Sequence, residues 1–392
     1  MRPLKIAEGI YDVGVKDWNI REFHGYSTYN GTTYNSFLIV DEKVVLIDAV
    51  KEGFGDELLR NISKIIDPKK IDIVVSNHTE MDHTGSLTQV MEAIGVDKPV
   101  YCSKMGEKNL LAHFPKKLNY QVVSNTFTLP IGKRTLHFLE TRMLHWPDSM
   151  FTYIPEDKIL FSSDAFGQHF AGQENFDDEV GISILSHAKK YFANILLLYA
   201  PKVKALIESV AAMNLDIKTI CPDHGIIWRH DPSVIIKKYM EWSEQKPGKK
   251  ALVIYDTMWH STEKMAQAIT AGINDAGVEV IPMDVRKWHR SDIITEVIDA
   301  GLVVVGSPTI NNGLYPTLAD VMTYMKGLKP QNKKAAAFGS YGWSGEAVKL
   351  LNGEFEAMGF TLASEGLKIQ YVPDEAQLST CFEFGKKLAE AL

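Results

Sequence analysis

The sequence predicts a two-domain α/β protein, in which an αββα sandwich over residues 1–248 precedes a doubly wound parallel sheet over residues 249–392. Two domains are expected because 392 residues exceed the size at which a single hydrophobic core usually stops growing. Short β-like runs dominate the first part, whereas strands and helices alternate regularly in the second. The polar segment 241–250, which contains Pro247 and Gly248, separates the two patterns.

The first domain is predicted from short apolar runs of β-like composition. These runs cover residues 35–40, 44–50, 71–77, 134–141, 150–154, 158–163 and 218–223. Helical patterns fall between some of them, at residues 54–66 and 86–95, and a further one at residues 232–242 ends the domain. This order is typical of mixed sheets covered by helices.

The second domain is predicted from strict alternation. Strand-like runs at residues 250–256, 278–285, 301–308 and 333–340 are each followed by a helical pattern, the first of which begins near residue 262. Such alternation indicates βαβ units and therefore a parallel sheet with helices on both faces.

Composition excludes several classes of protein. The net charge of −7 and the absence of a basic block argue against nucleic-acid binding, and no apolar run is long enough to span a membrane. The N-terminus lacks the apolar run of a signal peptide. Three widely spaced cysteines (Cys102, Cys221 and Cys381) form neither a disulfide framework nor a CxxC pair. We therefore expect a reduced, cytoplasmic protein.

The stretch "VVSNHTEMDHTGS" (74–86) places two imidazoles and two carboxylates directly after a buried strand. Alternate residues of extended backbone share a face, so His78 and Glu80 can bind one ion. Asp82 and His83, at the turn into the next helix, can bind a second ion beside it. Each histidine alone is more often a surface or capping residue, but the joint pattern favours a dinuclear metal site.

Three later loops supply matching ligands at strand ends, namely His145, Asp164 and His224. Three buried carboxylates need counter-charge, and two divalent cations with one bridging hydroxide bring the sum to zero. The loop resembles the HxHxDH motif of the metallo-β-lactamase superfamily, except that Glu80 replaces the middle histidine. A carboxylate there favours harder ions with mixed nitrogen and oxygen ligands, and iron is the natural candidate.

Three further polar residues have open roles. Asp223, next to His224, is either a solvated neighbour or a group that supports a ligand. His24 and His169 are either structural or close to the substrate.

In the second domain, three strand-end loops predict a site for flavin mononucleotide (FMN). The first runs into a helix N-terminus, whose free N–H groups favour a phosphate, and it lacks the GxGxxG of dinucleotide sites. The other two are rich in glycine, and Tyr341 or Trp343 can stack on the ring. A structural module without nucleotide is the alternative. The candidate residues are Thr257, Met258, Trp259, His260, Ser261, Thr262, Ser307, Pro308, Thr309, Ile310, Asn311, Asn312, Ser340, Tyr341, Gly342, Trp343, Ser344 and Gly345.

Together the two halves resemble the flavodiiron protein family over essentially the whole chain. The resemblance is carried by the motifs "NHTEMDHTG", "LHWPDSMF", "DAFGQH", "HGIIWR", "YDTMWHSTEKMA", "GSPTINN" and "YGWSGEA". It implies a metallo-β-lactamase-like domain followed by a flavodoxin-like domain. It also implies one iron on His78, Glu80 and His145, and a second iron on Asp82, His83 and His224. Asp164 would link the irons together with a hydroxide or oxide, and His83 is the ligand on which family members differ.

The same resemblance implies an activity and partners. The family reduces O₂ to water, NO to N₂O, or both, as a head-to-tail dimer or a dimer of dimers in which the FMN of one chain lies near the irons of the other. Nothing follows residue 392 and CxxC pairs are absent, so we expect a separate electron donor, either rubredoxin or a reduced deazaflavin. His24 is the candidate proton donor. The alternative is a metallo-hydrolase whose second domain is structural or binds a partner.

Overall fold

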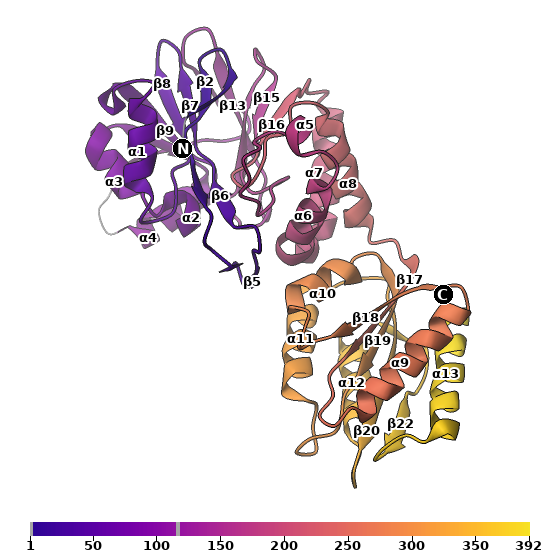
Figure 1. Cartoon of the computed structure of the whole chain (residues 1–392). Helices are drawn as coiled ribbons and strands as arrows, with labels where there is room; N and C mark the ends of the chain where they lie inside the picture. Colours follow the sequence, from indigo (N-terminus) through magenta and orange to yellow (C-terminus); the bar gives the residue numbers. More distant parts are fainter. Residues whose placement is uncertain (1–2, 115–117) are drawn as a thin grey trace. The chain divides into compact units, whose positions relative to one another are not determined.

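The computed structural model describes residues 3–114 and 118–392 (Figure 1). The chain divides into two compact units. The first contains Met1–His24, Thr28–Phe192 and Pro201–Met240, and the second contains Gly25–Ser27, Ala193–Ala200 and Glu241–Leu392.

Two sheets form the centre of the first unit (Figure 1). The first sheet has the order β1 (Leu4–Ala7), β2 (Ile10–Asp12), β7 (Phe37–Val40), β8 (Val44–Ile47), β9 (Ile71–Ser76), β10 (Pro99–Cys102) and β11 (Asn119–Val122). The second has the order β12 (Thr128–Pro130), β13 (Thr135–Glu140), β14 (Met150–Ile154), β15 (Ile159–Phe161) and β16 (Thr219–Cys221). A small separate sheet pairs β3 (Val15–Asp17) with β6 (Thr32–Tyr34). Every predicted β-run of this domain contains a strand.

Helices cover both sheets. They are α1 (Gly55–Ser63), α2 (Met81–Thr84), α3 (Leu87–Ile94), α4 (Lys104–His113), α5 (Asp177–Val180), α6 (Ile184–Tyr191), α7 (Ala200–Ala212) and α8 (Pro232–Glu244). A short 3₁₀ turn, η1, lies at Pro68–Lys70, and a two-residue strand, β4, lies at Glu22–Phe23. The short turns η2 (Phe192–Leu196) and η3 (Leu197–Tyr199) belong, apart from Phe192, to the second unit.

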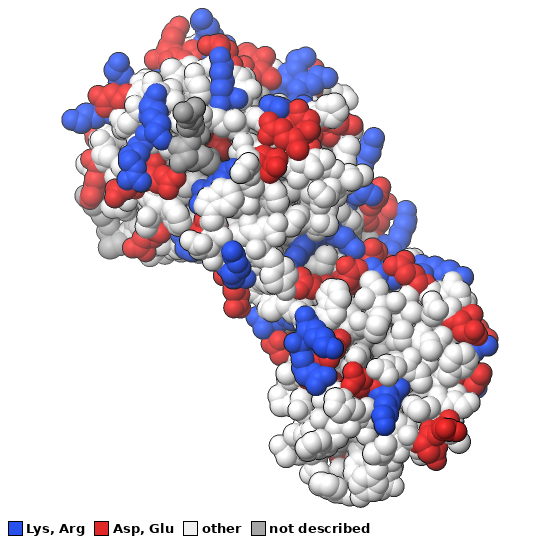
Figure 2. Space-filling view, in the orientation of Figure 1, with Lys and Arg blue, Asp and Glu red and all other residues white. Residues whose placement is uncertain are grey.

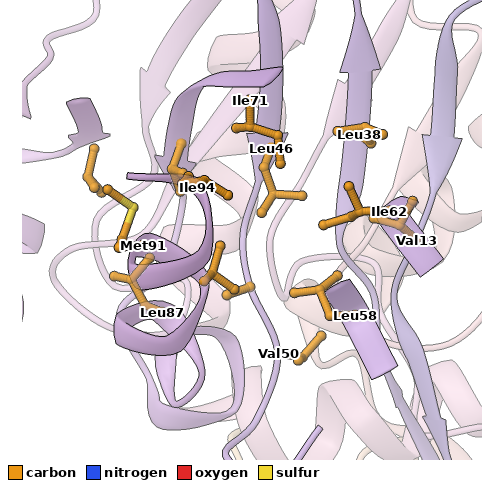
Figure 3. Close-up of a cluster of buried hydrophobic side chains, with 14 of the residues drawn as sticks. Val13, Leu38, Leu46, Val50, Leu58, Ile62, Ile71, Leu87, Met91 and Ile94 are labelled. Carbon is orange, nitrogen blue, oxygen red and sulfur yellow. The ribbon is translucent and has the colours of Figure 1, made fainter. Parts of the chain in front are cut away.

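The residues of β8 show why this arrangement forms. Successive strand side chains point to opposite faces, and all four residues are buried. Val45 and Ile47 join the core between the two sheets, whereas Val44 and Leu46 join the core beneath the helices. Figure 3 shows Leu46 of this outer core with Leu58 and Ile62 of α1 and Leu87, Met91 and Ile94 of α3. A strand that is apolar on both faces requires a layer on each side, and the predicted αββα sandwich is confirmed.

The second unit is a twisted sheet with helices on both faces. The strand order is β18 (Glu279–Asp284), β17 (Gly248–Tyr255), β19 (Ala300–Gly306), β20 (Lys334–Tyr341) and β21 (Thr361–Leu362), and β22 (Leu367–Gln370) also pairs with β20. All these pairings are parallel. The helices are α9 (Ser261–Asp275), α10 (Arg290–Val297), α11 (Pro316–Leu328), α12 (Ala347–Ala357) and α13 (Glu375–Glu390); the unit also includes β5 (Tyr26–Ser27). The predicted doubly wound sheet is confirmed.

The surface carries charges of both signs. Figure 2 shows Lys and Arg interspersed with Asp and Glu over the face in view, as expected from 42 basic and 49 acidic residues. Among the described residues, no helix has the length and apolar character needed to cross a bilayer. The three cysteines are buried and free.

Candidate metal centre and cofactor-binding edge

The loop after β9 is held in place by hydrogen bonds at both ends. The Asn77 N–H donates to Asp48 Oδ1 at 2.8 Å, and the Asn77 side chain accepts from the Thr152 hydroxyl of β14 at 2.7 Å. Glu80 is in extended conformation immediately before α2, and the Thr84 hydroxyl donates back to its carbonyl at 2.9 Å. Strand-like backbone therefore positions His78 and Glu80, whereas the helical turn positions Asp82 and His83.

The other three candidate ligands come from the second sheet. His145 lies in the connection between β13 and β14, and Asp164 and His224 follow β15 and β16. Since β15 and β16 are parallel neighbours, their carboxyl ends lie at one edge, and the Asp223 N–H donates to the Ser163 carbonyl across it at 2.8 Å. The site thus draws ligands from both sheets of the sandwich.

The structure brings all seven candidate ligands together in two groups. The first contains His78, Glu80, His145 and Asp164, and the second contains Asp82, His83 and His224. Within each group, one donor atom from every residue lies within 4.8 Å of the others.

A carboxylate oxygen faces the imidazoles in each group. In the first, Glu80 Oε2 is 3.0 Å from His145 Nε2 and 3.4 Å from His78 Nε2. In the second, Asp82 Oδ2 is 3.1 Å from His224 Nε2 and 3.2 Å from His83 Nε2. All four histidines therefore turn Nε2 towards the centre of the site.

Asp164 reaches both groups at once. Its Oδ2 lies 3.0 Å from His145 Nε2 and 3.4 Å from His78 Nε2. Its Oδ1 lies 3.3 Å from both His83 Nε2 and His224 Nε2. One oxygen per group is the geometry of a carboxylate that links two ions.

The inward-facing atoms have no hydrogen-bond partners within the protein. They are His78 Nε2, Glu80 Oε2, both carboxylate oxygens of Asp82, His83 Nε2, His145 Nε2, both carboxylate oxygens of Asp164 and His224 Nε2. Buried polar atoms in native proteins almost always have partners, so these residues fit a pair of cations that would satisfy all of them together. Four imidazoles with three carboxylates suit first-row transition ions such as Fe²⁺ rather than Mg²⁺ or Ca²⁺.

The electrostatics favour charged carboxylates. Burial alone would raise the pKa of Glu80, but the close imidazoles of His145, His24 and His78 lower it far below its usual range. Burial likewise opposes ionisation of Asp164, yet the surrounding imidazoles hold its pKa well below its usual range. The site thus presents ionised oxygens, as metal ligands must be.

The groups that hold the outward imidazole nitrogens of His78 and His224 could not be identified from the sequence. His78 Nδ1 lies 3.0 Å from Asp148 Oδ2, and His224 Nδ1 lies 2.6 Å from the Thr33 carbonyl. The only signal for Asp148 is its place three residues after His145, and a backbone carbonyl such as that of Thr33 leaves no signal in side-chain types.

Asp223 is not a solvated neighbour, so that alternative was wrong. It is fully buried, and Asp223 Oδ2 lies 3.6 Å from His83 Nδ1. Burial raises its pKa to about 6, although the nearby His83 opposes this rise. The remaining alternative, a group that supports a ligand, agrees with its position.

His24 lies beside the same cluster, with both ring nitrogens buried. Its Nε2 is 3.4 Å from Glu80 Oε1 and 3.7 Å from Asp82 Oδ2, and its ring stacks on Phe23 at 3.9 Å between centroids. His169 is buried one layer further out, where Nδ1 lies 2.7 Å from the Thr32 hydroxyl and the ring lies 4.8 Å from that of His224. Of the two uncertain histidines, His24 is the one whose side chain approaches the carboxylates.

The three candidate FMN loops follow β17, β19 and β20, which are adjacent parallel strands. Hydrogen bonds join them: Thr262 Oγ1 and Ser340 Oγ are 2.8 Å apart, and the Thr309 N–H donates to the Ser340 carbonyl at 3.0 Å. The structure therefore brings all three loops to one edge of the sheet, where ligands of such sheets bind.

The edge has the features of a phosphate site beside a flat ring. α9 begins at Ser261, and the buried Thr257 hydroxyl beside it has no protein partner. Gly345 has φ of 93°, a conformation that favours glycine. Trp259 and Trp343 are 81% and 87% exposed, so each offers an aromatic face to a planar ligand. These residues fit a flavin mononucleotide.

Both halves match known families. Residues 32–225 match the profile described as ODP family beta lactamase, and residues 253–385 match the Flavodoxin profile. The first match contains all seven candidate metal ligands, and the second contains all candidate FMN residues.

Individual relatives match over the whole chain. A nitric oxide reductase from Moorella thermoacetica is 46% identical over 99% of this chain and 98% of its own length. The structure of rubredoxin oxygen:oxidoreductase from Desulfovibrio gigas superposes with a TM-score of 0.97 at 43% identity, covering 100% of this chain and 98% of that one. The flavodiiron protein from Giardia intestinalis superposes with a TM-score of 0.95 at 35% identity, covering 100% and 96%.

Proposed function

The chain belongs to the flavodiiron protein family, and from that premise we propose that it is an oxidoreductase that reduces O₂ to water, NO to N₂O, or both. The observation that carries this proposal is the seven-residue cluster whose inward-facing atoms lack partners within the protein, in one chain with a flavodoxin-like sheet. The Moorella thermoacetica relative is named a nitric oxide reductase and the Desulfovibrio gigas relative an oxygen oxidoreductase, which leaves the hydrolase alternative without support.

We assign one iron to His78, Glu80 and His145 and the other to Asp82, His83 and His224. Asp164 would link the two ions, because each of its oxygens faces one group. His83 is included because its Nε2 points inward with those of the other three imidazoles.

FMN is assigned to the edge formed by residues 257–262, 307–312 and 340–345. The N-terminus of α9 and the hydroxyls of Thr257 and Thr262 would hold the phosphate, and the exposed tryptophans would flank the ring. We keep 1–248 and 249–392 as the domain boundaries, in line with the start of β17 at Gly248.

When bound, FMN stores two electrons and two ferrous ions supply one each, which matches the four electrons that O₂ reduction to water needs. The protein's own residues hold the metal ligands rigidly and provide protons. His24 Nε2, directed at Glu80 and Asp82, is the group we assign to proton delivery at the site.

Electrons come from a separate rubredoxin-type donor, as the name of the Desulfovibrio gigas relative suggests. We further propose a head-to-tail dimer or dimer of dimers, in which the FMN of one chain serves the irons of its partner. The cytoplasm is the proposed location, in keeping with three free cysteines.

The test is anaerobic turnover of the iron- and FMN-loaded protein with reduced rubredoxin, in which O₂ and NO consumption are compared. Two irons and one FMN per chain, with consumption of either gas, would support the proposal. Zinc without flavin, or a loaded protein that consumes neither gas, would refute it. His24→Gln tests the proton-delivery role, since it should lower kcat while both irons remain bound.

A further inference from the structure

The carboxylate of Asp148 lies directly behind His78. It is 1% exposed, and its Oδ2 accepts from His78 Nδ1 at 3.0 Å and from the Thr79 N–H and hydroxyl at 2.8 Å each. Asp148 Oδ1 accepts a hydrogen bond from Asn109 Nδ2 at 3.1 Å, and the Ser103 hydroxyl donates to the backbone carbonyl of Asp148 at 2.7 Å. The carboxylate is therefore fixed from several sides before any ion is considered.

This contact determines which nitrogen of His78 can bind a metal. An ionised carboxylate only accepts hydrogen bonds, so the proton of the neutral imidazole must sit on Nδ1. The lone pair then lies on Nε2, the atom that faces Glu80 and Asp164. A hydrogen bond to a negative charge also makes the imidazole a stronger donor to a metal.

In the second group, neither imidazole makes a hydrogen bond to a carboxylate through its outward nitrogen. His224 Nδ1 lies 2.6 Å from the Thr33 carbonyl, a neutral acceptor. His83 Nδ1 lies 3.6 Å from Asp223 Oδ2, which is beyond hydrogen-bond distance. The two ion positions have similar ligand types, but they differ in the groups that face the outward Nδ1 atoms of their imidazoles.

We propose that Asp148 is a positioning residue that makes the two metal positions unequal, so that the position formed by His78, Glu80 and His145 binds its ion more tightly. The proposal rests on the dinuclear function proposed above. It predicts two separate steps in metal binding to the wild-type protein, and it predicts that loss of the Asp148 charge weakens the tighter step alone.

The diagnostic variant is Asp148→Asn, which keeps the size of the side chain and one acceptor oxygen but removes the charge. Loss of such a supporting group typically costs about 10- to 100-fold in metal affinity. The matched control is Asn109→Ala, which removes a donor to Asp148 Oδ1 and to the Thr79 hydroxyl at 3.0 Å but leaves the His78–Asp148 contact intact. The affinity of the control for each ion should stay within about threefold of the wild-type value, because the substitution removes no ligand and no contact to a ligand.

The experiment titrates the metal-free, FMN-loaded protein with ⁵⁷Fe²⁺ anaerobically against a competing chelator, and Mössbauer spectra distinguish the two irons. At limiting iron, wild type and Asn109→Ala should show mainly the quadrupole doublet of the tighter position, whereas in Asp148→Asn that doublet should weaken and the iron should spread over both positions. A single binding step of equal affinities in wild type, or unchanged binding in Asp148→Asn, would overturn the proposal.

A second measurement needs no variant. Histidine-selective ¹⁵N spectra of the zinc-loaded wild-type protein should show His78 carrying its proton on Nδ1, with a downfield, slowly exchanging resonance. A proton on Nε2, or a metal bound through Nδ1, would refute the assignment even if Asp148→Asn failed to fold. Neither measurement uses O₂ or NO, so a failure of the proposed reductase activity would be seen separately.

Discussion

Asp164→Asn replaces the one carboxylate that faces both groups of metal ligands. Its two oxygens lie 3.0–3.4 Å from four imidazole nitrogens, one oxygen to each group. An amide offers a single oxygen, so its NH₂ must point at one of the two groups. The variant should therefore bind one iron tightly and the second poorly.

The size of the effect follows from burial. Asp164 is fully buried, and removing one partner from a buried charge pair typically costs about 3–5 kcal/mol. At about 1.4 kcal/mol per factor of ten, the second iron should bind roughly 150- to 4,000-fold more weakly. The folded, metal-free protein should persist, because the change removes a buried negative charge.

The assay is iron content per chain after dialysis against a chelator of known affinity, together with the far-ultraviolet circular dichroism of each sample. Asp12→Asn is the matched control, since Asp12 is also buried but lies in β2, outside both groups of metal ligands. The control should retain two irons. If Asp164→Asn also retained two irons at wild-type affinity, Asp164 could not be the linking ligand.

Three further predictions concern other parts of the chain. Burial raises the pKa of Asp12 from 3.8 to about 6, so its ionisation lowers the stability of the folded protein as pH rises from about 4 to 6. The free energy of unfolding of Asp12→Asn relative to wild type, measured in urea, should therefore increase by up to about 3 kcal/mol between pH 4 and pH 7. An equal difference at both pH values would contradict this. Thr257→Val removes a buried hydroxyl assigned to the FMN phosphate and should weaken FMN binding about tenfold or more in a fluorescence titration, whereas unchanged affinity would remove Thr257 from the site. Leu58→Ala empties part of the core in Figure 3 and should lower the free energy of unfolding by about 2–5 kcal/mol in urea; a loss below 1 kcal/mol would show that the site collapses around the gap.

Much of the fold could be read from local patterns. The apolar run 71–77 is a strand because its residues are buried on both faces, and alternation after residue 249 required a parallel sheet with its loops at one edge. Other elements left weaker signals. The edge strand β11 exposes three of its four residues, and the helix α13 combines a polar face with a capping box at Asp374 that had not been recognised as a start signal.

The candidate ligands were accessible for a different reason. His78, Glu80, Asp82 and His83 lie within one loop, so strand and helix periodicity alone indicates which pairs point together. Asp148 received no assignment, and the role of Asp223 stayed open between two alternatives, because both roles depend on which ring nitrogen faces the carboxylate and on burial by distant strands. Both are consequences of tertiary packing that residue spacing does not encode.

The supply of ligands from both sheets has a mechanical consequence. His78 follows a strand of the first sheet, whereas Asp164 and His224 follow strands of the second, and the Thr152–Asn77 hydrogen bond spans the same gap. Ions bound here would hold the two sheets together reversibly, and they would connect residues that lie far apart in the sequence. Because the seven ligands come together only in the folded chain, the binding free energy of the ions would stabilise the folded state over the unfolded one. Loss of metal should therefore loosen the contact between the two sheets first. Amide hydrogen exchange should become faster in β9, β15 and β16 before it does in the outer core of Figure 3.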